Sequence, residues 1–108
     1  MSNNQLFNSL LQRVHDAVEK ALEDTAVMVQ AEAREDVPKD TQALMHSIQA
    51  EKVSDLTYKV TANTKYALYV HEGYVSKSGR FIAGTPYLTG PISRQKVKIL
   101  DRIRENLQ

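Results

Sequence analysis

The chain has 108 residues, of which 42% are apolar and 25% are charged, and its formal net charge is +1. This length allows one domain with a modest core, and the absence of cysteine excludes disulfides, thiolate metal sites and cysteine nucleophiles. No apolar run is long enough to span a membrane. The N-terminal residues lack the basic start and unbroken apolar core of a signal peptide, so we expect a cytosolic protein.

The first predicted element is a helix over residues 4–34. Its apolar side chains recur at alternating spacings of four and three residues, as in an amphipathic helix, and Pro38 prevents the helix from continuing. At about 1.5 Å per residue such a helix is roughly 45 Å long, whereas a compact domain of this size is only about 35 Å across. We therefore expect either a break near Thr25 or one end that projects and packs on another molecule. The stripe consists of Phe7, Leu11, Val14, Val18, Ala21, Thr25 and Met28.

A turn and a β-hairpin are predicted next. Pro38 ends the long helix, and Asp40 or Thr41 can cap a short helical turn that follows. Apolar and polar residues then alternate on both sides of a polar connection at 52–55. This alternation predicts an antiparallel hairpin at about 47–62.

The last third of the chain is predicted to hold two helices separated by a loop. A short helix over 65–72 is stopped by Gly73 in a left-handed conformation, and its Tyr66, Tyr69 and Val70 are expected to pack against the sheet. We judge the apolar content of residues 74–84 too low for this segment to order by itself, which predicts a mobile loop. A stripe of aliphatic residues predicts a C-terminal helix over 91–106. The fold class is therefore α+β, with both long helices packed on a small antiparallel sheet.

The charges are divided unevenly along the chain. Residues 1–55 carry ten acids and five bases, a net charge of −5, whereas residues 56–108 carry three acids and nine bases, a net charge of +6. The two halves could attract each other within one fold, or they could form a surface divided by sign that suits subunit contacts or nucleic acid. The basic face of the C-terminal helix could likewise be solvated, meet phosphates or meet an acidic neighbour, so a small nucleic-acid-binding module is the alternative function. Its residues are Arg94, Lys98, Arg102 and Arg104.

The sequence does not indicate an active site, a cofactor or a metal. His15, His46 and His71 have no metal-ligand spacing along the chain, which leaves only a site built through tertiary contacts. Asp36 and Asp40 flank Pro38, where turn and capping roles are expected. An enzyme would have to rest on these two aspartates together with His46 and His71.

Three segments taken together resemble a known family. They are VPKDTQALMHSI (37–48), YALYVHEG (66–73) and TPYL (85–88), and they follow a long N-terminal helix. In this order they resemble the small head–tail joining proteins of long-tailed bacteriophages, also called minor capsid, tail-component, neck or tail-completion proteins. The resemblance covers about residues 5–107, with Gln42 and Tyr74 standing where the family pattern has Gly and Thr. The motif residues are Pro38, Asp40, Thr41, Leu44, Ile48, Tyr66, Ala67, Tyr69, Val70, Gly73, Pro86, Tyr87 and Leu88.

The resemblance implies a single joining domain over 1–108 that is a non-enzymatic structural protein of the virion neck. Copies of the chain would form a six- or twelve-fold ring, assembled in the host cytoplasm, between a head-closure protein and a tail terminator or tail tube protein. Non-specific contact with channel DNA is a further expectation, and a membrane is not expected. The loop would order against a neighbouring subunit. The expected contact residues of the loop are Tyr74, Lys77, Arg80, Phe81 and Ile82.

Overall fold

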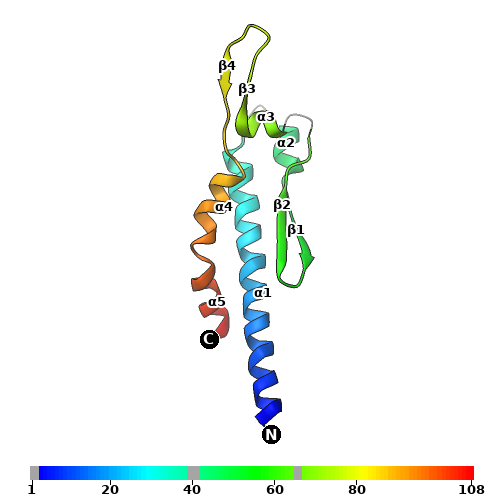
Figure 1. The fold of residues 1–108 in the computed structure, drawn as a ribbon, viewed down its shortest axis with the longest axis vertical. Coiled ribbons are helices and arrows are strands. Elements are labelled where there is room, and N and C mark those ends of the chain that lie inside the picture. The colour runs from blue at the N-terminus through cyan, green and yellow to red at the C-terminus, as the bar shows by residue number, and fades with distance from the viewer. Residues whose placement is uncertain (1–2, 39–41, 65–66) are drawn as a thin grey trace.

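The computed structural model describes residues 3–38, 42–64 and 67–108. One long helix runs along the molecule, and the other elements pack beside it or extend beyond it (Figure 1). Helix α1 (Asn3–Asp36) runs unbroken for 34 residues, about 51 Å at 1.5 Å per residue. The molecule is a rod of 72 × 21 × 20 Å. Figure 1 shows the other elements beside the C-terminal part of α1 and beyond it, while its N-terminal end projects alone. The helix therefore does not break near Thr25, and the expectation of a projecting end is confirmed.

The β1–β2 hairpin packs along α1. Helix α2 (Gln42–Ser47) leads into β1 (Gln49–Ser54), which pairs antiparallel with β2 (Thr57–Thr61), and Gln49 lies opposite Thr61. The Ala50 amide donates to Gln30 Oε1 at 2.6 Å, and the Arg34 guanidinium donates to the carbonyl oxygen of Ile48 at 2.7 Å. Polar side chains of α1 thus hold the start of β1, where backbone groups would otherwise lack partners.

A second hairpin occupies the segment that was expected to be a loop. Helix α3 (Ala67–Glu72) is followed by β3 (Gly73–Val75) and β4 (Phe81–Ala83), which pair antiparallel. The turn between them closes because the Ser76 amide donates to Arg80 O at 2.8 Å and Gly79 adopts φ 84°. Apolar content was a poor guide to residues 74–84, because backbone hydrogen bonds rather than buried side chains shape this segment. Its mobility stays a prediction.

The predicted C-terminal helix over 91–106 is corrected to two helices, α4 (Thr89–Lys96) and α5 (Ile99–Leu107). At the junction the Lys98 amide donates to Gln95 O at 3.0 Å, and Arg102 Nη1 donates to the same oxygen at 3.4 Å. The Gln95 side chain is 1% exposed and is held by α1 and α5. The break follows because Gln95 is fixed by tertiary contacts, which a periodic pattern of apolar residues does not reveal.

The core lies at the C-terminal end of α1, where α1, α2 and the segment before α4 meet. Its buried members are Ala33, Val37, Leu44, Ile48 and Tyr87. Along the rest of α1 the contact with α4 and α5 buries small residues such as Ala17 and Ala21. The α+β class is confirmed. Within the part of the chain that the structure describes, no helix has the length and apolar character needed to cross a membrane.

Candidate functional site

The three motif segments meet in the core. Leu44 and Ile48 from the first, Ala67 from the second and Tyr87 from the third pack together. The Tyr87 hydroxyl donates to the carbonyl oxygen of Ala67 at 2.9 Å, and burial raises the pKa of Tyr87 above its ordinary value. The Thr85 amide donates to Val70 O at 2.8 Å, which fixes the return of the chain after the second hairpin. These motif residues therefore form the junction from which the hairpins and helices extend.

Other motif residues lie at the surface or in turns. Gly73 has φ 86° and ends α3, as expected from its position after a short helix. Tyr69 is 56% exposed, so the expectation that it packs against the sheet is wrong. A helix of six residues buries one face, and here that face carries Val70, about 100° around the axis from Tyr69. Pro38 and Pro86 are exposed. Asp40, Thr41 and Tyr66 lie outside the described residues.

The projecting end of α1 carries an exposed apolar stripe. The inner part of the same stripe is buried at Ala17, Ala21 and Thr25, where α5 covers it. At the projecting N-terminal end of α1 that cover is absent in Figure 1, and Phe7 is 61% exposed. We call this surface the α1 apolar end; it consists of Leu6, Phe7, Leu10, Leu11 and Val14. Soluble monomers rarely expose a contiguous apolar patch of this kind outside an interaction site.

The β3–β4 hairpin presents a second exposed surface at the opposite end of the rod (Figure 1). Val75 and Phe81 face each other across the two strands, and Phe81 is 65% exposed. Lys77 and Arg80 are exposed beside the turn, and Ile82 is partly covered. Tyr74 pairs with Ile82 through the backbone, and its side chain lies outside the described residues. All five predicted contact residues therefore lie on this hairpin, and four of them have side chains that the structure describes.

The basic residues predicted to face DNA or an acidic partner are largely engaged within the chain. Arg94 contacts Glu32 at 3.2 Å and Asp36 at 2.8 Å on α1, and the hydrogen bond that Arg94 donates to Asp36 raises the pKa of Arg94. Arg102 donates to Thr25 Oγ1 at 3.0 Å and to the side chain of Gln95. Charges of the C-terminal half thus attract those of the N-terminal half within one fold, the first of the two interpretations of the charge division. Arg104 pairs with Asp101 at 3.7 Å, and Lys98 is exposed.

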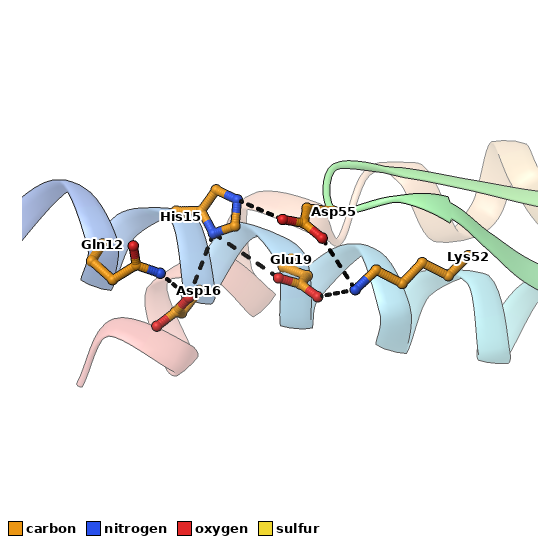
Figure 2. A network of polar contacts seen from close by, with 6 residues as sticks. All are labelled: Gln12, His15, Asp16, Glu19, Lys52 and Asp55. Atoms are coloured by element: carbon orange, nitrogen blue, oxygen red, sulfur yellow. Dashed lines mark hydrogen bonds and ion pairs between the residues drawn. The ribbon is translucent and has the colours of Figure 1, made fainter.

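A network of polar side chains ties the β1–β2 turn to α1 (Figure 2). Lys52 Nζ lies 2.6 Å from Glu19 Oε1 and 3.4 Å from Asp55 Oδ1. His15 Nε2 lies 3.7 Å from Asp55 Oδ2, and His15 Nδ1 lies 3.4 Å from Asp16 Oδ1. The hydrogen bond that the Lys52 ammonium donates to Glu19 raises the pKa of Lys52. The network holds a hairpin whose outer strand residues are mostly exposed.

Comparison with known protein families bears on what these surfaces serve. Residues 4–73 match the family described as Bacteriophage HK97-gp10, putative tail-component. The chain belongs to this family. The matched region covers well over half of the chain and includes α1, the first hairpin and α3. No curated protein and no solved structure matches the chain.

Membership of the HK97-gp10-like family makes the chain a phage tail-component protein and a component of the virion. As a tail component it has structural partners within the phage particle. The residues considered for catalysis have other contacts in this tail-component protein. Asp36 pairs with Arg94, and His71 contacts Glu72 Oε1 at 2.6 Å and the ring of Tyr87 edge-on at 5.2 Å.

Sequence reasoning missed the polar network of Figure 2. His15 and Glu19 are four residues apart on a helix, and that spacing places both side chains on one face. This signal was available. The approach of Lys52 and Asp55 to this face could not be predicted from the sequence, because it depends on how the hairpin packs on α1.

Proposed function

We propose that this tail-component protein is a ring subunit of the phage neck, which connects the DNA-filled head to the tail during assembly. The role is structural and not enzymatic. Copies of the chain would form a six- or twelve-fold ring between a head-closure protein and a tail terminator or tail tube protein. Family membership supports the virion role. The exposed α1 apolar end is the observation that supports a contact between subunits.

The α1 apolar end is large enough to contribute substantially to association. Five apolar side chains there are each about half exposed. Complete burial of one such side chain stabilises by about 1.5–3 kcal/mol, so covering the exposed halves would contribute roughly 4–7 kcal/mol per copy. Association costs a comparable amount in lost translational and rotational freedom. The contact would therefore be weak for a single pair and stable in a closed ring, where each copy makes two such contacts.

The β3–β4 hairpin gives the subunit a second exposed surface, which differs from the α1 apolar end. It lies at the opposite end of a 72 Å rod from the projecting end of α1. Two different surfaces on one chain favour heterologous contacts, which close into a ring when the rotation per subunit is suitable. Lys77 and Arg80 on the hairpin would then meet an acidic neighbour or the DNA in the channel.

Electron microscopy of virus particles that lack this protein tests the proposal. We expect filled heads and separate tails, and normal joined virions would refute the neck role. Complementation with Leu11→Glu, which places a charge on the α1 apolar end, should fail to restore joining. Val53→Glu is the matched control because Val53 is equally exposed but lies on β1, and it should restore joining.

The alternative role as a nucleic-acid-binding module makes a different prediction. Because Arg94 and Arg102 are paired within the chain, we expect the isolated subunit to bind DNA weakly. Tight binding that falls steeply as the salt concentration rises would favour the alternative, since such a fall reports the release of counterions from phosphates.

A further inference from the structure

Three potential metal ligands from two distant segments converge beside α1. His15 and Glu19 lie one turn apart on the helix, and Asp55 comes from the turn between β1 and β2. One ligand atom from each of the three residues lies within 4.8 Å of the other two. Figure 2 shows the imidazole and the two carboxylates pointing toward one another. The tertiary structure thus assembles a set of ligands that linear spacing alone does not display.

The chemistry of this set suits a borderline divalent cation. One imidazole nitrogen and two carboxylate oxygens are ligands of Zn²⁺, whereas Mg²⁺ and Ca²⁺ favour sites made of oxygen alone. Zinc–ligand distances of about 2.1 Å place neighbouring tetrahedral ligands about 3.4 Å apart. Asp55 Oδ2 lies 3.7 Å from His15 Nε2, whereas Glu19 Oε2 lies 4.0 Å from the other ring nitrogen, Nδ1, and one ion can bind only one of these nitrogens. Because one ligand atom of each residue lies within 4.8 Å of the others, rotation of the His15 ring and of the two carboxylates would bring both carboxylates to one imidazole nitrogen, with water as the fourth ligand.

Lys52 shows that this position attracts a cation. Its ammonium lies between Glu19 Oε1 and Asp55 Oδ1, at 2.6 Å and 3.4 Å. The lysine side chain is 45% exposed, and ion pairs at such exposure contribute little to stability. A divalent cation that also binds the imidazole can therefore displace the ammonium into water.

We propose that His15, Glu19 and Asp55 form a Zn²⁺-binding site in which Lys52 competes with the metal. Bound zinc would join the β1–β2 turn directly to α1. The hairpin would then be held by coordination bonds in place of exposed ion pairs, and the free protein with Lys52 in the site would be the alternative state. This inference does not depend on the neck role.

Isothermal titration of the full chain, without a histidine tag, with zinc chloride tests the site. We expect one Zn²⁺ per chain and a rise in the melting temperature that EDTA reverses. His15→Ala and Asp55→Asn should each weaken binding by about tenfold or more. Lys52→Met should strengthen it several-fold, because the variant lacks the competing ammonium. His46→Ala is the control, since His46 is exposed on α2 away from these ligands.

Several outcomes would overturn the proposal. Absence of saturable binding, equal affinity of wild type and His15→Ala, or loss of binding in His46→Ala would each exclude this ligand set. An unchanged affinity in Lys52→Met would show that the lysine and the metal do not share a position. Circular dichroism of each variant separates a lost ligand from a lost fold, and Asp55→Asn tests the site with the smallest change in shape.

Discussion

Gly84 lies where the second hairpin leaves no room for a side chain. It follows β4, opposite the point where β3 begins at Gly73. A Cβ atom at position 84 would collide with the backbone nitrogen of Gly73 and the carbonyl oxygen of His71, and would lie 2.6 Å from the carbonyl carbon of Glu72. All three atoms belong to the backbone and cannot move aside by a side-chain rotation. Gly84→Ala should therefore force the two strands apart.

The expected loss follows from comparison with Gly79. Overpacking typically costs about 1–3 kcal/mol, and rigid backbone atoms place Gly84→Ala at about 2 kcal/mol or more. Gly79 has φ 84°, but a Cβ atom added there would meet nothing within 4 Å. Gly79→Ala thus suffers only left-handed strain of about 1–2 kcal/mol, reduced by about 0.4–1 kcal/mol through the lower entropy of the unfolded chain. Its net cost should be about 1 kcal/mol.

Urea unfolding measured by circular dichroism gives the free energy of unfolding for both variants. Amide hydrogen exchange at Ser76, whose amide donates to Arg80 O, reports the hairpin itself. We expect Gly84→Ala to lose more stability than Gly79→Ala and to lose protection at Ser76. The reasoning is refuted if Gly84→Ala is as stable as Gly79→Ala and keeps this amide protected.

Three further predictions concern buried polar groups. Tyr87→Phe should lower the free energy of unfolding by about 1–3 kcal/mol in urea, because the Ala67 carbonyl oxygen loses its donor; an unchanged midpoint would contradict this. Because burial raises the pKa of Tyr87 in the folded state, its contribution is complete below the ordinary tyrosine pKa of about 10 and is lost as the pH rises above it. Titration of stability from pH 9 to pH 11 should therefore show a decline that is smaller in Tyr87→Phe. Gln95→Leu should lower the free energy of unfolding by about 1–3 kcal/mol, because Arg102 loses a buried hydrogen-bond acceptor and the α4–α5 junction loses the side chain that fixes it. An unchanged melting temperature in calorimetry would exclude that role.

The sequence by itself determined the elements that depend on local patterns. The spacing of apolar residues in 4–34 predicted α1, because the period of a helix appears in the spacing of residues that are close in sequence. Its length predicted either a break near Thr25 or a projecting end, and only the structure decided for the projecting end (Figure 1). Alternation predicted the first hairpin, and Gly73 marked the end of α3, because glycine adopts the left-handed conformation at low cost. Leu44, Ile48 and Tyr87, which the motif segments singled out, are buried in the core.

Only the tertiary structure decided which distant groups meet. The second hairpin forms through backbone hydrogen bonds, which leave no periodic trace in residues 74–84. The C-terminal helix divides because Gln95 is held by partners on α1 and α5. Arg94 faces α1 rather than solvent alone because Glu32 and Asp36 lie opposite it. The approach of Asp55 to His15 has the same origin, since a contact across some forty residues depends on how two elements pack and not on the residues beside either one.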